Sequence, residues 1–108
     1  MYEPTRKIMS FTIAGFSHWY GAGHISELKP GDKLDLVSEP DNPYDSCAVA
    51  IYLGEDKLGY VPAAMNGEIS QLMYFGYADI FECIVTQVDP EAHPEAQVRV
   101  SIFVKDNR

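Results

Sequence analysis

Apolar and polar residues alternate with a period of two along several short stretches of the chain, which is the pattern of half-buried β-strands. In residues 7–14, Met9, Phe11 and Ile13 occupy every second position and are expected to face the interior. The same alternation, or a short apolar run beside turn residues, predicts five further strands, around residues 34–36, 48–53, 58–61, 78–88 and 97–104.

One stretch has a helical period instead. It lies between Pro62 and Gly76, where Asn66 is placed to cap a helix and Gly76 is placed to end it. The apolar residues that can share one face of this helix are Ala64, Ile69, Leu72 and Met73. We expect it to be the main helix of the protein and to cover one open end of the β-structure.

The order of these elements favours a mainly β (α+β) fold. With 108 residues, the chain is long enough for one domain with its own core. Six short strands, with one helix between the fourth and the fifth, suggest a small, closed or nearly closed six-stranded β-barrel, because closure hides the strand edges. Side chains fill the interior of such a small barrel, so a ligand is expected to bind outside, on a face or between loops.

The charge balance limits the functions that fit the chain. Sixteen Asp and Glu against eight Lys and Arg give a net charge of −8, and the basic residues form no stripe along the sequence. Tight, non-specific binding to phosphate backbones depends on positive charge, so any nucleic-acid site must be local. The acidic balance is also what an ordinary solubilising surface would show.

The cysteines and the N-terminal segment favour a cytoplasmic protein. Cys47 and Cys83 have no CxxC spacing, are too few for a disulfide framework, and are expected to be reduced thiols in strands. The first apolar stretch is interrupted by Ser10 and Thr12, so a signal peptide is not predicted. No stretch approaches the roughly 18 apolar residues of a membrane span.

Three consecutive residues in the glycine-flanked first loop, His18, Trp19 and Tyr20, are the first candidates for binding. Three adjacent side chains in a loop cannot all point inward, so at least one ring is expected to be exposed. An exposed ring can stack on a nucleobase, which contributes about 1 to 3 kcal/mol per base. The same rings could instead fold back and plug one end of the barrel.

The second candidate loop is "EPDNPYD", which directly precedes an apolar strand. Asp41, Asn42 and Asp45 can accept hydrogen bonds from nearby backbone amides, and Pro43 fixes φ, so a turn can form here without any ligand. Such a turn does not require Tyr44 beside Asp45. A carboxylate can accept a hydrogen bond from a sugar hydroxyl while the neighbouring ring stacks on the base, and this pair would recognise a strand end.

Six short motifs, in order, carry a resemblance to a known family: "IAGF", "WYG", "PGD", "EPDNPYD", "AVAIYL" and "LGYVPA". The chain resembles the HIRAN domain, a module fused to replication-fork remodelling helicases and also found as short stand-alone bacterial proteins. The similarity covers about residues 8–76 and weakens afterwards. It implies an OB-like β-barrel with short helices, in which residues 1–108 form a single domain with a core of about residues 7–104.

The resemblance also implies a function: non-enzymatic binding of single-stranded DNA at a free 3′ hydroxyl, in DNA repair or replication-fork processing, without cofactor or metal. Trp19, with Tyr20 beside it, and Tyr44 match stacking rings, and Asp45 matches the carboxylate that meets the 3′ hydroxyl. The DNA-binding residues implied in this way are His18, Trp19, Tyr20, Asp41, Asn42, Tyr44, Asp45 and Tyr60. A helicase or nuclease partner would supply catalysis.

The chain departs from the DNA-binding pattern of this family at basic positions. His18 stands where a DNA-binding member has an arginine, and Ala63 stands where that member has a lysine. Because an unperturbed histidine is mostly neutral at pH 7, a phosphate contact from His18 would be weak and pH-dependent. Tyr60 replaces a histidine and could donate to a phosphate. Asp41 replaces an amide with a charge.

A protein-interaction module is one alternative function. In it, Trp19, Tyr20 and Tyr44 would form an exposed aromatic patch for a partner protein on an acidic domain. Its binding should depend less steeply on salt than the binding of a nucleic acid.

A metal-dependent nuclease is a second alternative, with Glu39, Asp41 and Asp45 as ligands of a divalent ion. No histidine or lysine stands at a useful interval from them, and no nucleophile or phosphate-binding motif is present. We therefore expect neither a metal site nor an enzyme. His24 and His93 are expected to be solvent-facing loop residues.

Overall fold

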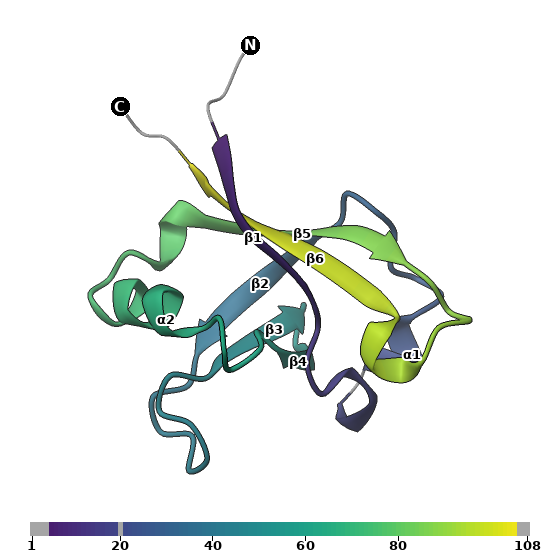
Figure 1. The fold of residues 1–108 in the computed structure, drawn as a ribbon, viewed down its shortest axis with the longest axis horizontal. Helices are drawn as coiled ribbons and strands as arrows, with labels where there is room; N and C mark the ends of the chain where they lie inside the picture. The colour runs from purple at the N-terminus through teal and green to yellow at the C-terminus, as the bar shows by residue number, and fades with distance from the viewer. Residues whose placement is uncertain (1–4, 20, 106–108) are drawn as a thin grey trace.

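The computed structural model describes residues 5–19 and 21–105, and within this part six strands form one antiparallel sheet in the order β1-β6-β5-β2-β3-β4. Figure 1 shows the sheet curled, with the start of β1 and the end of β6 projecting together at the top. The strands are β1 (Thr5–Thr12), β2 (Lys33–Ser38), β3 (Val49–Leu53), β4 (Asp56–Tyr60), β5 (Phe81–Val88) and β6 (Val98–Lys105).

The helical segments lie at the ends of the sheet. Figure 1 shows α2 beside the end of β2, and α1 on the opposite side of the molecule. None of the helices among the described residues has the length and apolar character needed to cross a membrane. The α-helices are α1 (Gly21–His24) and α2 (Gly67–Tyr74), and the 3₁₀ helices are η1 (Phe16–His18), η2 (Ala78–Ile80) and η3 (Pro94–Ala96).

The elements predicted from the periodicity are confirmed, with shifted ends. All six strands are present, and residues 78–80 form η2 instead of the start of β5. The predicted helix is α2, in which Ile69 is buried and Met73 packs against the core, whereas Leu72 is 40% exposed. Asn66 precedes this helix but makes no capping hydrogen bond with its side chain, because that side chain has another partner.

The core lies inside the curled sheet and includes the predicted inner residues of β1. Phe11 and Ile13 are buried, and Met9 is half-buried against them. Cys83 also belongs to the core, where burial and the negative charge of Asp35 raise the pKa of its thiol to about 12. Cys47 was also expected in a strand, and this expectation was wrong, because Cys47 is half-buried in the turn before β3. The thiols of Cys47 and Cys83 are both free.

A single backbone bridge connects the two edge strands of the sheet. Past the end of β1, Ala14 exchanges two hydrogen bonds with Tyr60 at the end of β4, each with an N···O distance of 2.9 Å. This bridge is the only pairing between the two edges among residues 5–19 and 21–105. The sheet is therefore an OB-like curl that is nearly closed, and the fully closed form of the barrel is not observed.

Gly59 makes this bridge possible. Its φ of +155° is rare for residues with a side chain, and a Cβ atom here would overlap the carbonyl oxygen of Ala14 and lie 2.5 Å from Cγ2 of Ile13. The two edges can approach each other only because this position has no side chain.

The histidine ring of His24 has a structural role that the sequence did not suggest. His24 ends α1, and its ring nitrogens lie 2.8 Å from Oε2 of Glu27 and 2.7 Å from Oδ2 of Asp56. Hydrogen bonds to Glu27 and to Asp56 raise the pKa of His24 above its usual 6.5. The ring therefore ties α1 to β4 and is not a solvent-facing loop residue, whereas His93 is exposed as expected.

We expect Gly59→Ala to lower the free energy of unfolding by about 2 to 3 kcal/mol, because the added methyl group must push Ala14 away or strain the backbone. Urea denaturation followed by circular dichroism measures this change. Gly67→Ala is the control, since a Cβ atom at Gly67 meets nothing within 4 Å, and it should leave stability unchanged or slightly higher. Equal stability of the two variants would contradict the role given to Gly59.

Candidate functional site

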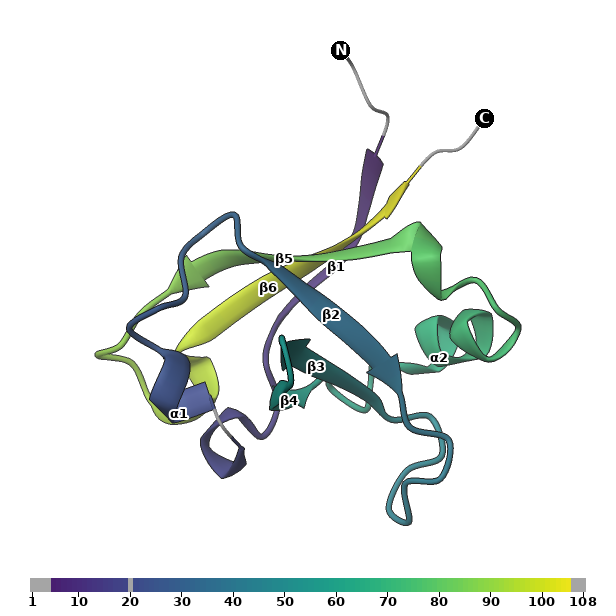
Figure 2. The same cartoon turned by 180° about the vertical axis from the view of Figure 1, so that it is seen from behind.

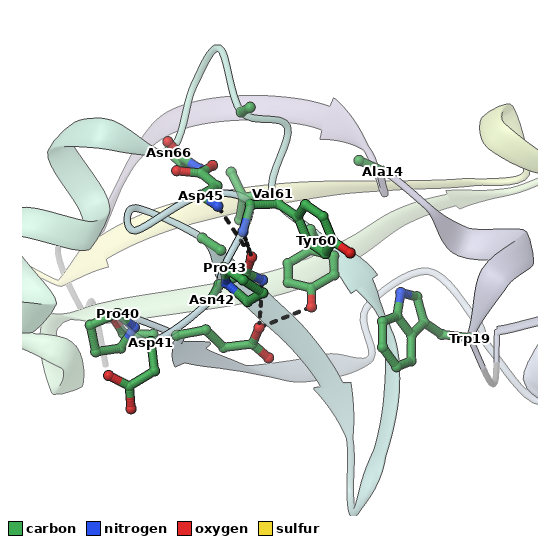
Figure 3. Close-up of a pocket in the computed structure, with 15 residues that line it drawn as sticks. Ala14, Trp19, Pro40, Asp41, Asn42, Pro43, Asp45, Tyr60, Val61 and Asn66 are labelled. Carbon is green, nitrogen blue, oxygen red and sulfur yellow. Dashed lines mark hydrogen bonds between the residues drawn. The ribbon is translucent and has the colours of Figure 1, made fainter.

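A pocket of about 820 Å³ opens where the loop between β2 and β3 faces the end of β4. Figure 2 shows that this loop projects away from the sheet. Figure 3 shows Trp19 on one side of the pocket, Tyr60 between Trp19 and the loop, and Asp45 with Asn66 on the far side. The residues that line the pocket are Ala14, Trp19, Ser38, Glu39, Pro40, Asp41, Asn42, Pro43, Tyr44, Asp45, Ala48, Tyr60, Val61, Ala63 and Asn66.

Most of the candidate residues from the sequence meet in this pocket. Among its lining residues are Trp19, Asp41, Asn42, Tyr44, Asp45 and Tyr60. His18 is exposed at the end of η1 and does not line the pocket, so its phosphate contact stays a prediction. Tyr20 lies outside the described residues.

Asn42 organises the loop. Its Oδ1 accepts hydrogen bonds from the backbone N–H groups of Tyr44 and Asp45, at 2.8 and 3.2 Å, and its Nδ2 donates to Oε1 of Glu39 at 3.1 Å. The interpretation of the loop as a turn built by its own polar side chains is therefore correct for Asn42. The turn leaves the ring of Tyr44 96% exposed at the mouth of the pocket.

The carboxylate of Asp45 is fixed by two donors. Oδ1 accepts from the backbone N–H of Cys47, and Oδ2 accepts from Nδ2 of Asn66, both at 2.9 Å. Asn66 is only 3% exposed, so this side chain anchors the loop to the start of α2. Each carboxylate oxygen can accept more than one hydrogen bond, so the half-buried Asp45 keeps acceptor capacity on the side of the pocket.

Glu39, Lys57 and Tyr60 form a polar cluster, of which Glu39 and Tyr60 line the pocket. The Nζ atom of Lys57 lies 2.7 Å from Oε2 of Glu39 and donates to the hydroxyl of Tyr60 at 2.9 Å, while that hydroxyl donates to Oε1 of Glu39 at 2.9 Å. Lys57 and Glu39 expose only 13% and 22% of their side chains. The cluster therefore joins β4 to the β2–β3 loop.

Hydrogen bonding sets the charge states of this cluster. Burial raises the pKa of Glu39, but hydrogen bonds from Lys57, Asn42 and Tyr60 outweigh it and hold the pKa below the usual 4.5. Burial lowers the pKa of Lys57, but hydrogen bonds with Glu39 and Tyr60 outweigh it and raise the pKa above 10.5. The ion pair thus stabilises the fold between these values and is lost as pH falls through the lowered pKa of Glu39 or rises through the raised pKa of Lys57.

Trp19 packs against this cluster through one side of its indole. Its ring meets the ring of Tyr60 edge to face, with centroids 6.0 Å apart, and Nζ of Lys57 lies 4.1 Å from the indole centroid. The side chain is 41% exposed, so the ring neither plugs the barrel nor lies free in solvent. It forms a fixed wall of the pocket.

The acidic residues of the loop do not form a metal site in the structure. Among residues 5–19 and 21–105 there is no group of three His, Cys, Asp or Glu side chains placed to hold an ion. Glu39 and Asp45 are bound instead to Lys57 and to Asn66. Three acidic side chains line the pocket, so the site does not attract phosphates by its charge.

Three contributors to the site are not among the candidates from the sequence. The sequence indicates Glu39 only as a possible metal ligand and Asn66 only as a helix cap, and Lys57 is one of eight basic residues that form no stripe. Asn66 does belong to the segment after "LGYVPA", but nothing local indicates its contact with Asp45, which lies 21 residues away. Lys57 carries no signal at all in the sequence.

A comparison with family models gives one match, described as the HIRAN domain, over residues 8–105. Two solved structures share the fold. A structural-genomics target protein from Lactobacillus plantarum is 21% identical, with a TM-score of 0.79, covering 98% of this chain and 100% of that one. The HIRAN domain of human HLTF is 14% identical, with a TM-score of 0.63, covering 94% and 81%. No curated protein sequence matches the chain.

We expect Asn66→Ala to lower the free energy of unfolding by about 1 to 3 kcal/mol, because it leaves Oδ2 of Asp45 without its partner. Asn66→Asp should cost more at pH 7, since it places a second carboxylate against the first. Urea denaturation of both variants measures these changes. If Asn66→Asp were as stable as the unsubstituted protein, the contact between residues 45 and 66 would not hold the loop.

Proposed function

The chain belongs to the HIRAN domain family, and from this premise we propose that it binds the 3′ end of single-stranded DNA in the pocket beside Trp19. The observation that carries the proposal is the arrangement of the pocket. Two aromatic rings and one fixed carboxylate, from segments far apart in the sequence, line the same hollow.

The two rings supply stacking surfaces for the bases. Tyr44 is 96% exposed on a loop that Asn42 holds in place, so a base that stacks on Tyr44 buries apolar surface without first reordering the backbone. Trp19 offers a second ring on the other side of Tyr60. Each stacked base contributes about 1 to 3 kcal/mol, largely independently of its identity.

The carboxylate of Asp45 supplies the recognition of the end. Its two oxygens are held by Cys47 and Asn66, so it can accept a hydrogen bond from a sugar hydroxyl at a fixed position. A 3′ phosphate, or a continuing strand, would bring an anion towards this carboxylate. Selectivity for a free 3′ hydroxyl therefore arises mostly from repulsion of the alternatives.

Phosphate contacts contribute little in this proposal. The hydroxyl proton of Tyr60 is already donated to Glu39, so a phosphate contact from Tyr60 would require breaking that hydrogen bond. Asp41 is an exposed negative charge on the same loop. We therefore expect a salt dependence that is shallower than that of proteins that neutralise many phosphates, but still steeper than that of an aromatic protein interface.

The biological setting that we propose is DNA repair or replication-fork processing in the cytoplasm. The chain would act without cofactor or catalysis of its own, as one domain with a core of about residues 7–104. A helicase or nuclease partner would then act on the end that this domain holds.

The proposal is tested with short oligonucleotides labelled at the 5′ end, by fluorescence anisotropy at two salt concentrations and at pH 6 and 8. We expect affinity for a free 3′ hydroxyl to exceed affinity for a 3′ phosphate by about tenfold or more, which corresponds to about 1.4 kcal/mol. Tyr44→Ala should weaken binding by a similar factor. Its matched control is Tyr74→Ala, which removes another largely exposed tyrosine, outside the pocket, and should change nothing.

Equal affinity for both kinds of end would contradict the recognition by Asp45. Equal losses in Tyr44→Ala and Tyr74→Ala would contradict the use of this pocket. If no oligonucleotide binds at either pH, the alternative of a protein-interaction module, with the same rings as its contact surface, takes the place of the proposal.

A further inference from the structure

Lys57 stands directly behind the wall of the pocket. It does not line the pocket, whereas three of its contact partners, Trp19, Glu39 and Tyr60, do. Its ammonium group lies 4.1 Å from the centroid of the indole ring and 4.8 Å from the centroid of the Tyr60 ring. One face of Trp19 is therefore covered by a cation from the protein itself.

Lys57 contacts both sides of the pocket, Trp19 on one side and Glu39 of the β2–β3 loop on the other. On one side is the indole of Trp19. On the other side, Glu39 accepts from Lys57 at 2.7 Å and from Asn42 at 3.1 Å. Asn42 in turn holds the backbone N–H groups of the next loop residues, those of Tyr44 and Asp45.

We propose that Lys57 is the positioning residue of this site: it holds Trp19 with a single open face for one base, and through Glu39 it fixes the loop that carries Tyr44 and Asp45. The inference about DNA rests on the proposed function. The inference about the position of Trp19 concerns the free protein and does not.

Lys57 is not placed to bind phosphate itself. An ammonium group has three N–H donors, and here it contacts a carboxylate, a hydroxyl and an aromatic face, with 13% of the side chain exposed. A phosphate could reach it only by displacing Glu39. The positive charge therefore acts on the ligand through the ring and the loop, and not by direct contact.

The geometry gives a specific pH signature. In the absence of the Lys57 ammonium, burial of Glu39 remains and its strongest donor is lost, so the pKa of Glu39 should rise from its lowered value towards or above 4.5. Protonation of Glu39 then weakens its hydrogen bond with the hydroxyl of Tyr60, whose ring packs against Trp19. The titratable groups around this carboxylate are Lys57 and Tyr60 of β4, Tyr52 of β3 beside Lys57, and Asp41 and Asp45 of its own loop.

Trp19 is the only tryptophan in the chain, so its fluorescence reports on this site alone. We expect Lys57→Met, which keeps the apolar stem, to shift the emission of Trp19 to longer wavelength at pH 7. The midpoint of its acid titration should rise by about one pH unit or more. Lys57→Arg, which keeps the charge and the stacking on the ring, should restore most of both properties. Circular dichroism in parallel separates this local change from unfolding.

The matched control is Lys33→Met, at the opposite end of β2 from the loop and outside the pocket lining. It changes the net charge equally and should leave the emission and its titration unchanged. Glu39→Gln removes the titrating group, so the acid transition of Trp19 emission should disappear in this variant. That variant keeps the test decisive if Lys57→Met fails to fold.

Oligonucleotide binding separates the two proposals. We expect Lys57→Met to weaken binding of a free 3′ end about tenfold relative to Lys33→Met. If the unsubstituted protein binds no oligonucleotide but the fluorescence changes occur, the proposed function fails and the positioning of Trp19 stands. Emission and acid midpoint unchanged in Lys57→Met, or an acid transition that persists in Glu39→Gln, would overturn the inference.

Discussion

The close approach of the two sheet edges at Ala14 and Gly59 is the constraint on which the site depends. The bridge fixes where the chain leaves β1, and therefore where the loop with Trp19 meets β4. Tyr60 takes part twice, since its backbone forms the bridge while its side chain joins the polar cluster of the pocket. Gly59 allows the bridge, and Tyr60, the next residue, forms it. These two residues therefore contribute both to the closure of the fold and to the construction of the site.

The polar residues around the pocket are occupied mainly with one another. Glu39, Asn42 and Asp45 each accept or donate hydrogen bonds within the protein, and no buried side-chain nitrogen or oxygen lacks a partner in the described part of the chain. Such a network fixes the backbone that carries the exposed Tyr44 before any ligand arrives, which reduces the entropy that binding must overcome. In a protein with a net charge of −8, this preorganisation has to replace the general attraction that basic proteins exert on nucleic acids.

Local patterns in the sequence were sufficient for much of the fold and for part of the site. Period-two alternation located the six strands, the helical period located α2, and turn chemistry identified the loop that carries Tyr44 and Asp45. The features that could not be predicted depend on pairing between distant residues. Asn66 reaches Asp45, and His24 reaches Asp56, across 21 and 32 positions, and neither contact leaves a local trace. The bridge between Ala14 and Tyr60, which nearly closes the sheet, also cannot be predicted from the order of the strands.

The central claim is that one preorganised pocket, between Trp19 and the loop of residues 39–45, receives a strand end. The most direct measurement is a two-dimensional ¹H–¹⁵N NMR titration with a short oligonucleotide that has a free 3′ hydroxyl. The account predicts that the largest shift changes fall on the indole N–H of Trp19 and on the amides of Asn42, Tyr44 and Asp45, and that the 3′-phosphorylated oligonucleotide causes much smaller changes. Shift changes centred elsewhere, or of equal size for both oligonucleotides, would contradict it.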